Sequence, residues 1–358
     1  MPHPPPGQAG ACFGMLSLIL VVAPAFASSR LALEFTAAPA FDSNAAQEAE
    51  EGGDIRPDLL LLTMGRAELQ GRARDRLSYS ATLEGGAKRF RREQAENALV
   101  LQFAGGLSGF LPEPLSLLVA IDSKDRRQPD GRRSYRAGGL SSGISWRLPA
   151  GFSLGSRVTG LAFWYVPDRD YDHEGWGGDL FLRWRGRGKQ AHLAVRRLSL
   201  AFQGVRLNHE GQEDPAGERR ADAVTRLDLE GSQLGRLVLS EGLFLQSTRS
   251  NSVGSANLRF GGRGSLGFAL PGEVDLSLRA SLLWARYDNP ELAEGIADPT
   301  FGVEDEETRS SVGVALRRLL IGPLTAELRW ARYFTIGAGP TYRRDTLLLG
   351  LRYGDDKL

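Results

Sequence analysis

The sequence predicts an all-β fold: a transmembrane antiparallel up-and-down β-barrel of about 16 strands, with a range of about 14–18. Three observations predict it. Apolar and polar residues alternate along one segment after another. The connections between these segments are alternately short and long. The chain also lacks an apolar run long enough for a membrane-spanning helix, and its mean hydropathy is −0.24.

The chain begins with a predicted secretory signal at residues 1–27. Residues 12–27 form a short apolar stretch that ends in Ala-Phe-Ala, the small-residue pattern that precedes a cleavage site. Residues 28–358 should then form a single barrel domain outside the cytoplasm. Because Cys12 is the only cysteine of the chain and lies in the leader, the exported part has no disulfide and no cysteine nucleophile.

The strand prediction is based on a period of two, which gives each segment one apolar and one polar face. In the segment 273–287, for example, Leu278 and Leu282 share a face, while Arg279 and Ser281 share the other. Three of the sixteen segments, 97–108, 190–203 and 236–247, alternate poorly. The predicted strands are 31–41, 60–72, 77–89, 97–108, 115–123, 135–148, 152–166, 176–185, 190–203, 222–233, 236–247, 253–270, 273–287, 308–321, 324–335 and 343–353.

The connections place this barrel in an outer membrane. Short Gly/Pro turns, such as 149–151 and 271–272, alternate with long polar connections, among them 42–59, 204–221 and 288–307. Outer-membrane barrels have short periplasmic turns and longer external loops. We therefore expect a protein of the outer membrane of a Gram-negative bacterium, with both termini in the periplasm. Its expected partners are membrane lipid, lipopolysaccharide and the barrel assembly machinery.

A secreted soluble sandwich or propeller is the alternative, since period two alone does not exclude it. The tryptophans favour the membrane, because Trp146, Trp164, Trp184, Trp284 and Trp330 lie within or at the ends of predicted strands, where interfacial girdles form. A closed barrel also leaves no strand edge to protect.

Charge is sorted along the chain although the net charge is only +1, a balance that argues against a nucleic-acid partner. The predicted strands hold 25 basic and 13 acidic residues. The connections are acidic, and 288–307 has eight acidic residues and no Lys or Arg. These loops favour solubility, with cation bridging to lipopolysaccharide as the alternative.

Because the lipid face is apolar, we expect most of the strand charge in the lumen. An electropositive lumen would admit anionic solutes or chains; alternatively, Arg and Asp or Glu pair across the wall and simply fill it. The predicted lumen-lining residues are Arg66, Glu68, Arg183, Arg226, Asp228, Arg279, Glu327 and Arg329.

The sequence contains no pattern typical of an enzyme. A His-x-Ser pair on one strand face, as in barrel phospholipases, is absent, and Asp172-His173 fits a solvated loop better than a protease site. Gly-rich stretches such as 261–264 are not followed by a helix and do not form a phosphate loop. We therefore expect no catalytic residues, no cofactor and no metal.

Both ends of the barrel sequence resemble a diverse group of outer-membrane barrels. Residues 42–45 (DSNA) follow the aromatic end of the first strand, and 342–345 (YRRD) lead into a last strand that contains LLLGLRY. These features are similar to the barrel parts of surface lipoprotein assembly modifiers and TPR-linked exopolysaccharide exporters. Those proteins usually carry a helical-repeat domain before the barrel, and here a signal and the first strand stand in its place. The resemblance implies a separate periplasmic partner.

Three functions remain open from the sequence. The first is a conduit in an envelope export machine that translocates a polysaccharide or a lipoprotein. The second is a structural, adhesion or motility component whose lumen is plugged by its own ion pairs. The third is a general porin, although none of the loops is distinctly long enough to fold inward as porin loops do.

Overall fold

The structure is a computed structural model. It describes residues 28–45, 55–73, 77–109, 111–129, 131, 133–166, 169–186, 193–213, 217–235, 237–251, 256–287, 309–336 and 342–354. The predicted signal segment 1–27 and the acidic loop 288–307 lie outside these residues.

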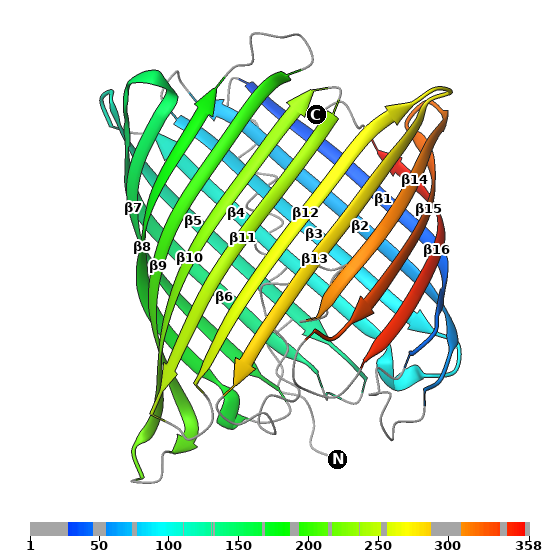
Figure 1. Cartoon of the computed structure of the whole chain (residues 1–358), viewed down its shortest axis with the longest axis horizontal. Coiled ribbons are helices and arrows are strands. Elements are labelled where there is room, and N and C mark those ends of the chain that lie inside the picture. Colours follow the sequence, from blue (N-terminus) through cyan, green and yellow to red (C-terminus); the bar gives the residue numbers. More distant parts are fainter. Residues whose placement is uncertain are drawn as a thin grey trace.

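Sixteen strands of the described residues close into one barrel, in which each strand pairs antiparallel with its neighbours in the chain and β1 pairs with β16 (Figure 1). The fold prediction is thereby confirmed, and every predicted segment overlaps an observed strand. The strands are β1 (Ser28–Asp42), β2 (Asp58–Ala73), β3 (Leu77–Phe90), β4 (Ala98–Gly109), β5 (Leu115–Arg127), β6 (Tyr135–Arg147), β7 (Phe152–Tyr165), β8 (His173–Gly186), β9 (Leu193–Glu213), β10 (Arg219–Gly235), β11 (Leu237–Ser250), β12 (Asn257–Leu270), β13 (Val274–Tyr287), β14 (Ser310–Ile321), β15 (Leu324–Phe334) and β16 (Arg343–Gly354).

Alternation along each strand gives the barrel an apolar outer surface. On β1, Leu31, Leu33 and Phe35 are 62%, 59% and 53% exposed, while the side chains between them are partly buried. Leu347, Leu349 and Leu351 repeat the pattern on β16, the strand that closes the barrel against β1. A closed ring of paired strands satisfies every backbone group of the wall, so it can present this surface to lipid. No helix among the described residues is long and apolar enough to cross a membrane.

Two of the three poorly alternating segments form strands whose inner face is also apolar. On β4, Val100 is 2% exposed and lies between the exposed Leu99 and Leu101. On β11, Phe244 lies on the inner face, between the exposed Leu243 and Leu245. Apolar residues on both faces remove the contrast on which period-two analysis depends.

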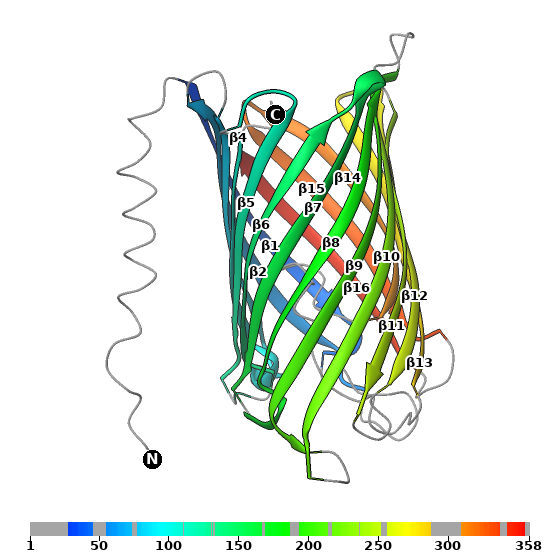
Figure 2. The ribbon, with the colours of Figure 1, turned by 90° about the vertical axis from the view of Figure 1, so that its left-hand side faces the viewer.

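The predicted long connection at 204–221 is wrong, because β9 continues to Glu213 and β10 begins at Arg219. The β9–β10 hairpin projects beyond the other strands at one end of the barrel (Figure 2). Strands that leave the bilayer need no apolar outer face, so the sequence pattern stops before the hydrogen-bonded ladder does. Near the rim of the barrel, His209 on β9 and Asp222 on β10 hold the two strands together through a 3.1 Å contact.

The two ends of the barrel differ in their connections. At one end, tight turns join the strands, and left-handed residues such as Gly151 (φ 82°) and Gly272 (φ 79°) reverse the chain. This short-turn end also holds the start of β1 and the end of β16, because Glu34 pairs with Gly354. The opposite, long-loop end holds the β9–β10 projection.

Candidate functional site: the barrel lumen

The larger cavity of the lumen has a volume of about 790 Å³ and lies toward the short-turn end. Strands β1–β8 build it. Its lining includes four charged side chains, and all of them are arginines: Arg30, Arg72, Arg157 and Arg183. Serines and glutamine supply most of the remaining polar wall. Among the described lining residues there is no Asp or Glu, so the local formal charge of this cavity is positive.

A second cavity of about 400 Å³ runs along β10–β15. Five arginines line it, together with only two carboxylates, Asp228 and Glu230. The arginines are Arg226, Arg259, Arg263, Arg279 and Arg329. Both cavities therefore carry more positive than negative charge.

Several of these arginines are held by carboxylates on the same wall. Arg226 donates from Nε to both carboxylate oxygens of Asp228, at 3.0 and 2.9 Å, and its guanidinium lies 4.3 Å from the Phe244 ring. Arg263 is paired with Glu230 and Arg157 with Asp179. These pairs fix the guanidinium groups in place and neutralise part of their charge.

Elsewhere the carboxylates are too few for one-to-one pairing. Glu327, which is 2% exposed, is shared by Arg317 and Arg329 at 3.2 and 2.8 Å. Arg183 has its guanidinium 4.3 Å from the Phe181 ring, a cation–π contact that leaves the charge of the group intact.

The residues expected to line the lumen do not form one site. Arg183 lines the larger cavity, whereas Arg226, Asp228, Arg279 and Arg329 line the smaller. Arg66 and Glu68 pair at 3.0 Å on β2, and Glu327 lies beneath the guanidinium of Arg329. Five further arginines line the cavities without having been predicted from the sequence: Arg30, Arg72, Arg157, Arg259 and Arg263. Each of these arginines lies on the polar face of its strand, so the period-two alternation of the sequence could have identified them.

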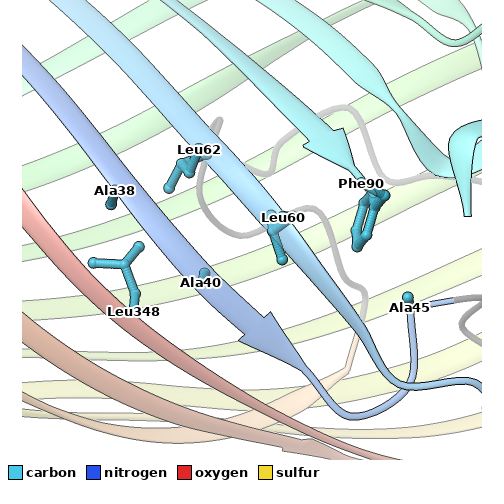
Figure 3. Close-up of a cluster of buried hydrophobic side chains, with 7 residues drawn as sticks. All are labelled: Ala38, Ala40, Ala45, Leu60, Leu62, Phe90 and Leu348. Atoms are coloured by element: carbon cyan, nitrogen blue, oxygen red, sulfur yellow. The ribbon is translucent and has the colours of Figure 1, made fainter. Parts of the chain in front are cut away.

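Toward the long-loop end, parts of the inner wall carry buried apolar and aromatic side chains. Ala38, Ala40, Leu60 and Leu62 form a buried apolar cluster with Phe90 and Leu348, and Ala45 packs onto it from the β1–β2 connection (Figure 3). On the strands β6–β8, Tyr135 and Phe163 are each 2% exposed, and His173 stacks on the Phe163 ring at 4.9 Å. The larger cavity lies in the other half of the barrel, whereas the smaller one reaches Ser311 and Tyr333, near the long-loop ends of β14 and β15.

The two motifs that carry the family resemblance meet at the seam between β1 and β16. Arg344 donates from Nε to both carboxylate oxygens of Asp42 at 2.9 Å, and both side chains are buried. Ser43 and Asp345 exchange two hydrogen bonds, one from the Ser43 backbone N–H (2.9 Å) and one to its Oγ (2.8 Å). The Asn44 amide donates to the backbone carbonyl of Arg343 at 3.4 Å. We call residues 42–44 and 343–345 the seam clasp, because they fasten the first strand to the last.

The closed ring of strands, the apolar outer surface and the polar lumen together identify an integral β-barrel of the outer membrane. Among the described residues, no group of three or more His, Cys, Asp or Glu side chains is placed to hold a metal ion.

The sequence matches no family model and no curated protein. Solved structures of similar architecture include the anion-selective porin from Comamonas acidovorans, with 12% identity, a TM-score of 0.49, and coverage of 92% of this chain and 100% of that one. CdiB from Acinetobacter baumannii has 10% identity and a TM-score of 0.46 over 90% of this chain, but only 60% of CdiB is covered. A bacterial polysaccharide outer membrane secretin has 12% identity and a TM-score of 0.41 over 90% and 97% of the two chains. At identities of 10% to 12% and TM-scores of 0.41 to 0.49, these similarities do not indicate a function for this chain.

Proposed function

We propose that this barrel is a conduit for anionic substrates across the outer membrane. The observation that carries the proposal is the larger cavity: the charged side chains of its described lining are four arginines, of which Arg157 is paired with Asp179. A lumen surrounded by low-dielectric protein and lipid concentrates the field of such charges and raises the local concentration of anions.

The pairing of other arginines agrees with this proposal. Ion pairs such as Arg226–Asp228 hold the wall rigid, and the remaining excess of guanidinium groups sets the sign of the potential. A guanidinium group can bind two oxygens of one carboxylate or phosphate at the same time, and it remains charged at any physiological pH. A series of guanidinium groups along the lumen offers successive weak binding sites, so that an anion can enter and can also leave.

The positions of the cavities favour a substrate that enters from the periplasm. The larger basic cavity lies toward the short-turn end, whereas parts of the long-loop wall carry buried apolar and aromatic side chains. An acidic polysaccharide chain fits this arrangement best, with an acidic segment of a lipoprotein as the other cargo. A separate periplasmic protein would deliver either one. A general anion porin shares the basic wall but needs an open passage at both ends.

The buried apolar and aromatic side chains of the long-loop half also favour a second function, a structural barrel with a closed lumen. In this case the arginine–carboxylate pairs would serve as internal packing, and no ion would pass.

Conductance separates these functions. The purified barrel is placed in a planar bilayer with a KCl gradient, and the reversal potential gives the chloride-to-potassium permeability ratio. We expect a ratio above one, which falls several-fold when Arg30, Arg72, Arg157 and Arg183 are replaced together by Gln. The matched control replaces four outward arginines, Arg89, Arg206, Arg249 and Arg286, by Gln and should leave the ratio unchanged. A barrel that is folded, as judged by the faster mobility of the unboiled protein on a gel, but that passes no current would refute the conduit and support the closed lumen.

A further inference from the structure

A second group of arginines lies on the outside of the barrel. Residues that pair directly in register point to the same side of the sheet. Arg89 pairs with Leu61, Arg286 with Leu258 and Arg206 with Trp176, and each of these partners is an exposed apolar residue of the lipid face. By the same criterion the outward set, which we call the arginine belt, comprises Arg89, Arg127, Arg136, Arg206, Arg249, Arg286, Arg332 and Arg343.

The belt lies at one height, near the long-loop end. Arg89, Arg249 and Arg286 are each the last residue but one of their strands, and Arg127 is the last of β5. Arg136 and Arg343 are the second and first residues of β6 and β16. Arg206 lies further from the end of its strand because β9 projects beyond the other strands. It is in register with Arg249, since both residues pair with Ala223 of β10.

The outer surface at the short-turn end is different. Aromatic and aliphatic side chains occupy most of the equivalent outward positions there. Trp146 is 49% exposed, Phe152 39% and Tyr353 60%, and each lies within two residues of its strand end. Arg196 and Arg318 are outward charges near this end, but they do not form a ring. The ring of outward arginines is therefore confined to the long-loop rim, whereas aromatic side chains occur at both rims.

The belt holds more positive charge than its carboxylates neutralise. Asp125 is shared by Arg127 and Arg136, at 2.8 and 3.5 Å. Asp345 is likewise shared by Arg332 and Arg343, at 2.8 and 3.5 Å. Arg89, Arg206, Arg249 and Arg286 are exposed, and none of the four forms an ion pair with another described residue.

We propose that the arginine belt binds the phosphate groups of a phosphorylated glycolipid in the external leaflet. A planar guanidinium donates two parallel hydrogen bonds to a phosphate, and it does so without losing its charge. Tryptophans of the same rim lie at the height where an acyl chain meets its headgroup. Trp330, for instance, has the Arg332 guanidinium 5.5 Å from its ring. A bilayer with such a lipid in one leaflet only would match a barrel with a ring of arginines at one rim only.

This inference does not depend on the conduit, because lumen and belt are on opposite faces of the wall. The test uses the full barrel in detergent and titrates it with three probes: lipid A carrying two phosphates, the same lipid A after enzymatic dephosphorylation, and phosphatidylglycerol. Bound lipid is counted by native mass spectrometry. We expect the bisphosphorylated lipid A to bind at least tenfold more tightly than the other two.

Two variants locate the binding. Replacing Arg89, Arg206, Arg249 and Arg286 together by Gln should weaken binding of bisphosphorylated lipid A about tenfold or more, whereas replacing the same four by Lys should restore much of it, since part of the interaction is charge alone. The lumen variant with Gln at positions 30, 72, 157 and 183 should bind the lipid as the unmodified barrel does. Equal binding of dephosphorylated lipid A or of phosphatidylglycerol, or equal loss in the lumen variant, would overturn the proposal. Unboiled gel mobility checks that each variant is folded.

Discussion

The seam clasp gives the sharpest prediction for stability. We consider the substitution Asp42→Ala. Asp42 is fully buried, and it accepts two hydrogen bonds from Arg344 Nε as well as one from the Asn44 backbone N–H at 3.0 Å. The substitution removes the Asp42 carboxylate from the Arg344 guanidinium, which is 5% exposed.

The expected cost follows from this burial. Removing one partner of a buried ion pair costs about 3–5 kcal/mol, because the other charge remains desolvated. Replacing both partners, as in Asp42→Ala with Arg344→Met, should recover most of that loss, since no uncompensated charge is left. The matched control is Glu113→Ala. Its partner Arg147 lies 3.2 Å away, but the two side chains are 87% and 71% exposed, and such a pair contributes about 0–1 kcal/mol.

The measurement is the urea midpoint of each variant in lipid vesicles, followed by tryptophan fluorescence. We expect a large shift for Asp42→Ala, a small one for the double variant and almost none for Glu113→Ala. If Asp42→Ala and Glu113→Ala shift the midpoint equally, the clasp does not fasten the seam. If the double variant is as unstable as the single one, the cost comes from lost hydrogen bonds rather than from a stranded charge.

Two further predictions concern the lipid face and the topology. Leu278→Arg places a charge in contact with lipid near the middle of β13 and should reduce the folding stability by about 2–4 kcal/mol, whereas Ser281→Arg places the charge in the smaller cavity and should cost far less. The folded yield in lipid vesicles measures both effects. Equal losses would mean that both faces of the strand are buried. Cysteines introduced at Glu218 and Asn289 should react with an impermeant thiol reagent on intact cells, and cysteines at Pro149 and Pro271 should not. The single native cysteine lies in the predicted leader. The opposite labelling pattern would mean that the barrel has the opposite orientation in the membrane.

Strand positions were predictable because every transmembrane strand has lipid on one side and the lumen on the other. Lipid requires an apolar outer face, water in the lumen permits a polar inner face, and the resulting alternation is visible even where single residues deviate. The prediction was wrong where that constraint ends. Beyond the bilayer, the β9–β10 hairpin is held by cross-strand pairs such as His209–Asp222, which leave no periodic trace in the sequence.

The lumen was harder to predict. A period of two places Arg183 and Arg279 on the inner face, but it does not give their height or their neighbours around the ring. The division into two cavities, and the burial of Phe90, Val100 and Phe163 near the long-loop end, depend on how the strands are arranged around the closed barrel. The meeting of Asp42 and Arg344 likewise depends on closure, because 302 residues separate them along the chain.

The distribution of arginine shows why a count of strand charge overstates the charge of the lumen. The rule that lipid-facing residues are apolar holds for the hydrocarbon core, but the strands have 11 to 21 residues, and most are longer than the core requires. Its last outward positions lie among headgroups, where a charge is stable. Arg89, Arg206 and Arg286 occupy such positions, so they add to the basic count of the wall without contributing to the potential inside it. Height along the barrel axis, together with face, therefore decides whether an arginine acts on a solute in the lumen or on a lipid outside.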